Sequence, residues 1–254
     1  MILRRVIKHM KNQEWTAIAL DFLIVVIGVF VGLQVNNWNE ARTLKDRETE
    51  LLTALRTDIQ LTLDATQAKI LSFEQVGEAG ARALAFLENG QSCEDACWPV
   101  VVDFFHASQW QKLRLNRSTY DDMRRLGLPR SRELINAVES YYTQNESLAF
   151  TLDEAPDYRA IVRGLIPLAI HVAYWVGCFK VEVDIESYLL DCPQAVSNEV
   201  AAQTAAAITA EPRIKPTLTD WTGYVRSYPS AMNDEIGFGE KAIAVLDAEM
   251  ERRK

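Results

Sequence analysis

The 254-residue chain has few of the residues from which catalytic and cofactor sites are usually built. It holds three histidines, and no GxSxG or HExxH motif and no glycine-rich phosphate loop occurs. His106 and His171 are the candidates for a general base, but an isolated histidine in an apolar segment is more often a hydrogen-bonded core residue. We therefore predict a non-enzymatic protein with no catalytic residue and no cofactor, and an enzyme is the least favoured alternative.

Positive charge is also in short supply. The chain has 27 lysines and arginines against 35 aspartates and glutamates, which gives a formal net charge of −8. An acidic balance of this kind argues against nucleic acid or an anionic lipid surface as the main partner. Hydrophobic residues make up 48% of the chain, which is enough for a globular core.

Cysteine is sparse, but the cysteines stand in two close pairs along the sequence. Cys93 is near Cys97, and Cys178 is near Cys192. Four cysteines allow three pairings, of which we favour the two local pairs. The alternative is a metal site made by Cys93, Cys97 and His106, but zinc usually takes four ligands and this CxxxC motif has no second pair. We predict structural disulfides in an oxidising compartment, and no metal.

The sequence also contains one long apolar segment. Residues 15–35 carry a single charge, Asp21. As a helix the run is roughly 31 Å long, about the thickness of the hydrocarbon core of a bilayer. Trp15 and Trp38 flank the run, and indole rings favour the headgroup level of a membrane. We predict a transmembrane helix over 15–35, with Trp15 and Trp38 as interface anchors.

The charges on either side of the run predict its orientation. Segment 1–14 is basic, whereas the charges after residue 35 roughly balance. Basic flanks stay in the cytoplasm, so we expect a short cytoplasmic segment 1–14, a span in the bacterial inner membrane and a periplasmic main domain. A cleaved signal peptide is the alternative, but its apolar core would be shorter, and its exit would hold small residues where Leu33–Trp38 is bulky and polar.

The exported part is predicted to be all-α. Apolar residues recur at spacings of three, four and seven over 40–88 and stop at Asn89-Gly90, which predicts a long juxtamembrane helix over 36–90. We interpret this stripe as core-facing. A coiled-coil stalk is the alternative, although its seam drifts after Leu63. Residues 91–254 are expected to complete a periplasmic helical bundle around the long first helix.

Two segments of that bundle carry more specific predictions. Segment 161–179 is mostly apolar, but an arginine, a proline and a histidine oppose membrane insertion, so we expect a core helix buried all round rather than a second span. Segment 211–230 holds three prolines and a glycine, which predicts a loop. A last helix is expected over about 234–252.

Two stretches resemble a bacterial protein family of unknown function. Residues 24–40, IVVIGVFVGLQVNNWNE, are similar to a membrane anchor of the type VVIGILIALQINNWNE, and Asp21 matches an acidic residue seven positions before its first glycine. Residues 118–142 resemble the family's segment SxYexLxxSG…LxxxIxxYY, although Arg125 and Leu126 replace the small residues usual before the glycine. The resemblance implies a single-pass, mostly helical envelope protein and brings no activity, cofactor or catalytic residue.

The predicted span also holds a candidate binding surface. Gly28 and Gly32 form a GxxxG motif, which lets two helix backbones approach closely in a membrane. At 100° per residue, Asp21, Val25, Gly28, Gly32 and Val35 fall within an arc of about 80°. A carboxyl group on the packing face of a span is a functional candidate. The alternative places Asp21 near the cytoplasmic interface, in reach of water and without a special role.

Three classes of function follow from these observations. The favoured one is an accessory or scaffold protein of an inner-membrane or envelope complex, whose partner on the GxxxG face is another membrane protein or a second copy of the chain. The alternative is a periplasmic ligand-sensing module that signals through a partner, because segment 1–14 is too short to carry an output domain. An envelope enzyme is the third class.

Overall fold

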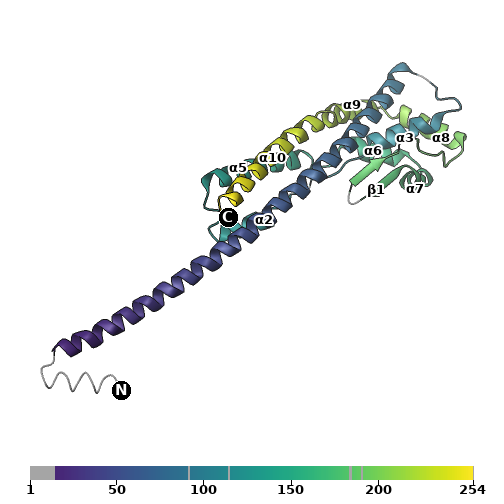
Figure 1. Ribbon diagram of the computed structural model, residues 1–254. Helices are drawn as coiled ribbons and strands as arrows, with labels where there is room; N and C mark the ends of the chain where they lie inside the picture. The colour runs from purple at the N-terminus through teal and green to yellow at the C-terminus, as the bar shows by residue number, and fades with distance from the viewer. Residues whose placement is uncertain (1–14, 91, 114, 183–184, 190, 254) are drawn as a thin grey trace. The chain divides into compact units, whose positions relative to one another are not determined.

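The computed structural model describes residues 15–90, 92–113, 115–182, 185–189 and 191–253, with the backbone alone at 15–18, 182 and 185. The predicted all-α class is confirmed, with one short hairpin added (Figure 1). The elements are α2 (Trp15–Asn89), α3 (Cys97–Ala107), α4 (Ser118–Arg125), α5 (Arg132–Thr151), α6 (Asp157–Leu165), α7 (Leu168–Gly177), β1 (Phe179–Glu182), β2 (Ile185–Tyr188), α8 (Asn198–Ala210), α9 (Ile214–Val225) and α10 (Tyr228–Glu251). The predicted cytoplasmic segment 1–14 and the side chain of Trp15 lie outside the described residues.

Two compact units divide the chain between Leu52 and Thr53, and each is described by itself. In the first unit, the large apolar side chains between residues 20 and 35 are all 45% to 71% exposed. Within the described ranges, the part of α2 that begins at Ala19 is the one unbent helix long and apolar enough to cross a membrane, and its most apolar window is 0% buried. The chain therefore has one candidate N-terminal membrane span.

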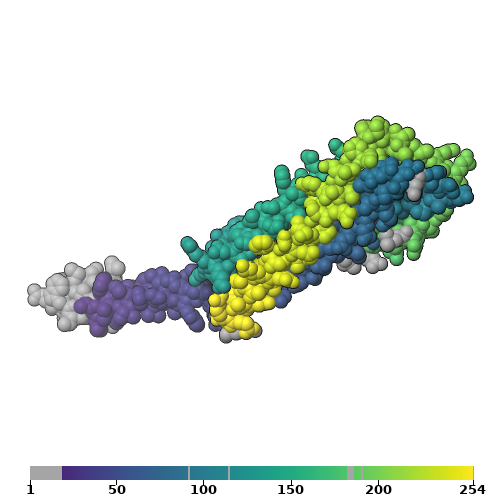
Figure 2. All heavy atoms as spheres, turned by 90° about the horizontal axis from the view of Figure 1, so that it is seen from above, coloured from purple at the N-terminus to yellow at the C-terminus, as the bar shows by residue number. Residues whose placement is uncertain are grey.

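The second unit contains three long helices that run side by side: the part of α2 after Thr53, α5 and α10 (Figures 1 and 2). The predicted apolar stripe of α2 faces this core, where Leu55, Ile59 and Leu63 are at most 4% exposed. Gly239 of α10 lies against Leu63 so closely that a Cβ would stand 2.4 Å from Leu63 Cδ2. The absence of a side chain at Gly239 thus sets how closely α10 packs on α2.

Shorter helices form a second layer of the same unit. α3 packs on α8, and α6 packs on α8 and α9. Two buried indoles tie the layer together, because Trp98 Nε1 donates to the Cys192 carbonyl at 3.0 Å and Trp221 Nε1 donates to the Ala107 carbonyl at 2.7 Å. Each indole brings a large apolar surface into the core and satisfies its one donor there.

The prediction of a single, fully buried helix over 161–179 is wrong. The chain forms α6 and α7, which meet at a bend of 112°. Pro167 precedes α7 with φ −58° and ψ 145°, and the residue before a proline is driven out of the helical region, so Ile166 ends α6. α7 buries Ile170 and Tyr174 but leaves Leu168 78% exposed and Val176 83% exposed.

The prediction of a loop over 211–230 is also wrong. α9 and the start of α10 occupy most of this segment. Pro216 lies in the first turn of α9, and Pro229 lies in the first turn of α10. A proline is tolerated there, because the N–H groups of the first turn have no partner within the helix. The prolines thus mark two helix starts, and the predicted last helix begins at Tyr228.

Candidate functional site

The first candidate site is the face of the span. Asp21, Val25, Gly28, Gly32 and Val35 lie on one continuous helical stretch of α2. Val25 is 51% exposed and Val35 is 58% exposed, and no described atom comes within 4 Å of where a Cβ would stand at Gly28 or Gly32. Within its own unit this face is open, and its two glycines leave the backbone accessible to another helix.

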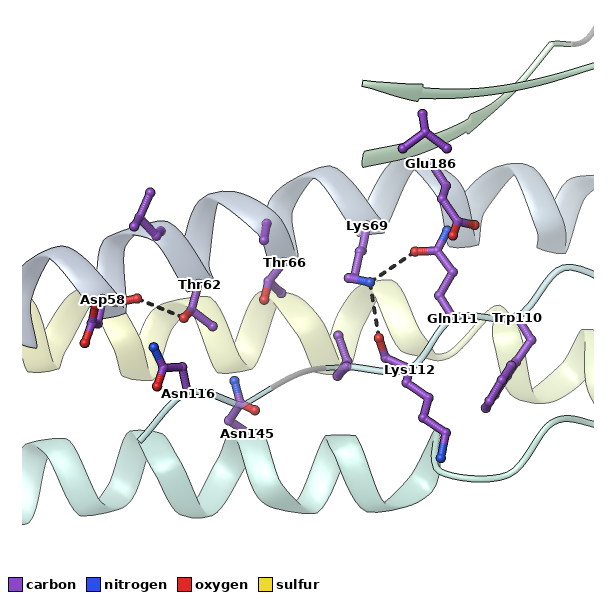
Figure 3. A pocket seen from close by; sticks show the side chains of 14 residues that line it. Asp58, Thr62, Thr66, Lys69, Trp110, Gln111, Lys112, Asn116, Asn145 and Glu186 are labelled. Carbon is purple, nitrogen blue, oxygen red and sulfur yellow. Dashed lines mark hydrogen bonds between the residues drawn. The ribbon is translucent and has the colours of Figure 1, made fainter. Parts of the chain in front are cut away.

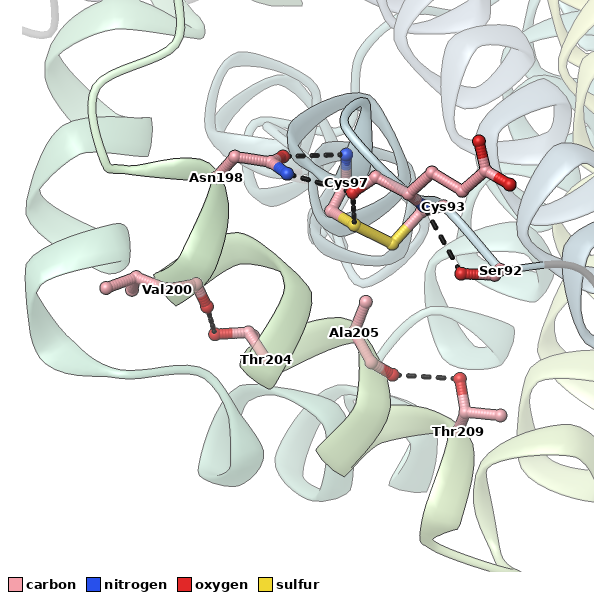
Figure 4. The surroundings of a disulfide bond; sticks show 9 residues. Ser92, Cys93, Cys97, Asn198, Val200, Thr204, Ala205 and Thr209 are labelled. Carbon is pink, nitrogen blue, oxygen red and sulfur yellow. Dashed lines mark hydrogen bonds between the residues drawn. A yellow bond between two sulfur atoms is a disulfide. The ribbon is translucent and has the colours of Figure 1, made fainter.

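The cysteines form the two local pairs. Cys93 is bonded to Cys97 and Cys178 to Cys192, each pair with its Cα atoms 4.8 Å apart. The loop that carries the first pair is held by Asn198 of α8, whose side chain accepts from Cys97 N at 3.2 Å and donates to the Glu94 carbonyl at 2.8 Å (Figure 4).

The metal site considered for Cys93, Cys97 and His106 is therefore excluded. The two sulfur atoms are bonded to each other, and His106 hydrogen-bonds elsewhere. In the part of the chain that the structure describes, no group of three or more His, Cys, Asp and Glu side chains is arranged to hold a metal ion. The first disulfide instead closes the loop that leads into α3.

His106 lies at the centre of a buried polar cluster, which we call the His106 cluster. Its members are His106, Tyr174, Gln109, Ser108 and Arg163. The Leu189 carbonyl can only accept, so His106 Nε2–H donates to it at 3.1 Å and Nδ1 accepts from the Tyr174 hydroxyl. The same hydroxyl accepts from Gln109 Nε2 at 2.9 Å. Both ring nitrogens of His106 are thus occupied.

Arg163 closes this cluster on one side. Its guanidinium donates to Gln109 Oε1 and to Ser108 Oγ, both at 2.9 Å, and stacks 4.7 Å from the centre of the Phe105 ring. Burial lowers the pKa of Arg163 to about 10, so it stays charged at neutral pH. Burial also lowers the pKa of His106 to about 4, so its ring is neutral there. Within the His106 cluster, every donor in this series of hydrogen bonds meets an acceptor, as a structural network requires.

His171, the other candidate base, is also hydrogen-bonded. Its Nε2 donates to the Arg163 carbonyl at 3.0 Å, and its ring lies edge-on to Phe105. His106 and His171 are thus both held by hydrogen bonds to backbone carbonyls, of Leu189 and Arg163 respectively. Their positions are those of core residues.

A second buried polar cluster lies between α2, α5 and α10. We call it the Glu235 cluster, and its members are Glu235, Asn145, Tyr141, Thr62 and Thr66. Glu235 is 0% exposed, and Asn145 Nδ2 donates to its Oε1 at 2.5 Å. Burial raises the pKa of Glu235, and its neighbours Asn145 and Thr66 limit the rise.

This second cluster is incompletely hydrogen-bonded. By strict hydrogen-bond geometry, Glu235 Oε2, Asn145 Oδ1 and the Tyr141 hydroxyl have no partner among the described residues, although Thr62 and Asn145 lie near enough to lower the pKa of Tyr141, and Thr66 near enough to lower that of Glu235. A buried polar atom without a partner costs about 1–3 kcal/mol, so three of them in one cluster need an explanation. The cluster adjoins a cavity of the second unit, through Asn145, Thr62 and Thr66.

That cavity is a groove of about 670 Å³ (Figure 3). One wall is α2 from Asp58 to Lys69, and the facing wall is formed by residues 110–113 and by Asn116. Asn145 of α5 lines the groove between these walls, and Glu186 of β2 lies at the Lys69 end. Cavities of roughly 300–1,000 Å³ are the usual size of small-molecule sites, so the groove is the second candidate site.

No protein-family model, no curated protein and no solved structure matches the chain. The resemblance of residues 24–40 and 118–142 to a bacterial family therefore stays a prediction.

Sequence reasoning missed the groove and the Glu235 cluster. Asn145 and Glu235 are 90 residues apart, so no local spacing joins them. The only available signal was a carboxylate between apolar residues: Glu235 follows Met232 by three positions and precedes Gly239 by four, which is the spacing of a buried helix face.

Proposed function

We propose that this chain is a non-enzymatic, membrane-anchored accessory or scaffold protein of the bacterial envelope. It binds its partner through the face of the span formed by Asp21, Val25, Gly28, Gly32 and Val35. One observation carries the proposal: two glycines and the only charge of the span share one open helix face. The partner is another membrane protein or a second copy of the chain.

The solvent around the proposed span is the hydrocarbon of the bilayer. Lipid chains are as apolar as leucine, so apolar burial drives no association between helices in a bilayer. Helices in a bilayer therefore associate through close backbone packing and through polar contacts. Gly28 and Gly32 allow the first of these, the close packing. Asp21 supplies the second, because a carboxyl group in or near hydrocarbon gains from a donor on a neighbouring helix by about 1–2 kcal/mol.

The charges beside the span and the paired cysteines support a location of the second unit in the periplasm. The basic segment 1–14 favours a cytoplasmic N-terminus. The described part of the chain holds its cysteines in two bonded pairs, as expected in an oxidising compartment such as the periplasm. We therefore assign the second unit to the periplasm and the span to the inner membrane.

No catalytic role is assigned to the second unit. Both ring nitrogens of His106 are hydrogen-bonded, and His171 Nε2 donates to the Arg163 carbonyl. Ligand sensing is the second candidate function, and the groove beside the Glu235 cluster is the observation that favours it. A sensing module of this kind would signal through the partner of the span.

The test is association of the full chain in lipid vesicles, measured by energy transfer between labelled copies and by cross-linking to co-purifying membrane proteins. Gly28→Ile and Asp21→Leu are each expected to weaken association by about tenfold, because each removes roughly 1–1.5 kcal/mol of packing or polar contact.

The matched control is Ala19→Ile. It also enlarges a small residue of the span, but at about 160° from the face, and it should leave association unchanged. Unchanged association in both Gly28→Ile and Asp21→Leu would refute the proposal. An equal loss in Ala19→Ile would show that any added bulk disturbs the span.

A further inference from the structure

We propose that the groove between α2, α5 and segment 110–116 is a binding site for a short neutral saccharide. The inference goes beyond the proposed role of the span. It concerns residues of the second unit alone, so each can fail while the other holds.

The shape of the groove sets the size of the ligand. Its α2 wall runs from Asp58 to Lys69, which is about 16 Å at 1.5 Å per residue. The volume of about 670 Å³ lies within the usual range for small-molecule sites. A long, open groove of this size accommodates a chain of a few sugar rings, whereas a compact metabolite would leave much of it empty.

The charges that line the groove favour a neutral ligand. Two carboxylates, Asp58 and Glu186, face two ammonium groups, Lys69 and Lys112, so the formal charges cancel. Ligands with a net charge are recognised by an excess of the opposite charge, as in phosphate and carboxylate sites. This groove offers no such excess.

Each of the four charges is also already engaged by the protein. Thr119 Oγ1 donates to Asp58 at 2.5 Å, the Tyr188 hydroxyl donates to Glu186 at 3.3 Å, and Lys112 Nζ donates to Asp153 at 2.6 Å. Lys69 Nζ donates to Gln111 Oε1 at 3.1 Å and to a backbone carbonyl at 3.2 Å. These bonds fix the charged groups in place, and a carboxylate still has lone pairs for the O–H groups of a ligand.

The remaining polar groups in the lining suit hydroxyls. Thr62, Thr66, Asn116 and Asn145 present hydroxyl and amide groups, each able both to donate and to accept. A sugar hydroxyl does the same, so adjacent donors and acceptors complement a row of hydroxyls. Few other neutral ligands present so many paired donors and acceptors in so small a volume.

Two lining residues also have unused hydrogen-bonding capacity. Trp110 Nε1 and Asn145 Oδ1 are buried, and neither has a partner among the described residues. Both atoms lie beneath the surface of the groove wall, out of contact with solvent. The half-buried Trp110 ring also offers an apolar face, against which the C–H face of a sugar ring packs.

Amino acids and short peptides fit less well. Their ammonium and carboxylate groups pair with an acidic and a basic residue, and in an amino acid these groups are only a few bonds apart. Glu186 and Lys69 share one end of the groove, but Glu186 already accepts from the Tyr188 hydroxyl, and Lys69 already donates to Gln111 and to a backbone carbonyl.

The test is calorimetric titration of the full chain in lipid nanodiscs with a panel of neutral saccharides: maltotriose, cellotriose, mannotriose and triacetylchitotriose. The comparators are trigalacturonate, deacetylated chitotriose and trialanine. At least one neutral saccharide should bind with a Kd below about 1 mM and at least tenfold more tightly than every comparator. Failure of the whole neutral panel, or tighter binding of any comparator, would overturn the proposal.

The site is tested by a matched pair of variants. Thr62→Val removes a hydroxyl that lines the groove and bonds the Asp58 carbonyl at 2.9 Å. Thr57→Val removes an exposed hydroxyl on the same helix that bonds the Thr53 carbonyl at 3.0 Å and does not line the groove. Thr62→Val should weaken saccharide binding by about fivefold, and Thr57→Val should leave it unchanged. Equal affinity in the two variants would place the binding outside the groove and refute the assignment.

Discussion

The His106 cluster and the Glu235 cluster bury similar numbers of polar side chains, yet they differ in how completely those side chains are hydrogen-bonded. In the first, the histidine, the tyrosine, the glutamine and the arginine bond one another in a consistent direction. In the second, a carboxylate oxygen, an amide oxygen and a phenol lack partners among the described residues. Only the second cluster adjoins the groove.

The difference shows which buried polar groups hold the fold together and which are available for a ligand. A complete network gains from every bond and is costly to interrupt. An incomplete one destabilises the protein, and such a defect persists where function makes use of it. The histidine that was a catalytic candidate in the sequence has both ring nitrogens hydrogen-bonded, whereas Asn145, which the sequence did not single out, lines the groove.

The largest expected effect is on the complete cluster. Tyr174→Phe leaves His106 Nδ1 and Gln109 Nε2 buried without a partner, so we expect it to lower the free energy of unfolding by about 3 kcal/mol. The measurement is guanidinium unfolding of the full chain in detergent, followed by near-ultraviolet circular dichroism. Tyr141→Phe is the matched control, because the Tyr141 hydroxyl, although near Thr62 and Asn145, forms no hydrogen bond of good geometry in the described structure. It should cost less than about 0.5 kcal/mol. Equal losses would mean that the two clusters do not differ.

The second-largest expected effect is on the pH dependence of stability, which should differ between the two clusters. Burial lowers the pKa of His106 to about 4 in the folded state, against an ordinary value of 6.5. Between these values the unfolded chain binds more protons, so stability falls as the pH drops from 6.5 towards 4. From pH 7 to pH 4.5 the loss due to His106 is about 2.5 kcal/mol. His106→Gln, measured in the same way, should lack this part of the pH dependence. An identical slope in the variant would show that His106 titrates normally.

The smallest of the three effects has the opposite sign. Burial raises the pKa of Glu235 in the folded state, so this group favours the folded state below its unfolded pKa, and that stability is lost as the pH rises through the folded pKa. Glu235→Gln keeps the acceptor for Asn145 and removes the buried charge. We expect the variant to be more stable than the wild type by on the order of 1 kcal/mol at pH 7.5.

The pH profile supplies the control for that prediction. Below about pH 4, Glu235 is protonated in both states, and the gain of Glu235→Gln should disappear. A variant that is less stable at pH 7.5 would show that the carboxylate is well accommodated, and the contrast between the clusters would fail.

Local patterns predicted much of the fold. The long helix was visible in the spacing of Leu55, Ile59 and Leu63, and its end was visible at Asn89-Gly90, because helix periodicity and helix stops are local. The two cysteine pairs, 4 and 14 residues apart, were also within the reach of sequence reasoning. The errors came from prolines. Pro167 divides a segment predicted to be one helix, whereas Pro216 and Pro229 begin helices in a segment predicted to be a loop.

The groove was beyond sequence reasoning for a different reason. Its walls come from α2 and from an extended segment more than forty residues away, joined by Lys69 and Gln111, which are 42 residues apart. Hydropathy and spacing describe one element at a time, so they cannot show which side chains two distant elements bring together. The face of the span, in contrast, could be predicted from the sequence, because all its residues lie on one helix.

The contact between the first and last helices of the second unit has a consequence for how the protein is made. Arg56 of α2 pairs with Asp247 of α10 at 2.6 Å, 191 residues further along the chain. At about 5–20 residues per second, a ribosome takes roughly 10–40 s to make that intervening length. Throughout this interval the stripe of Leu55, Ile59 and Leu63 has no α10 to cover it. The newly made chain therefore exposes part of this apolar stripe until its final helix emerges.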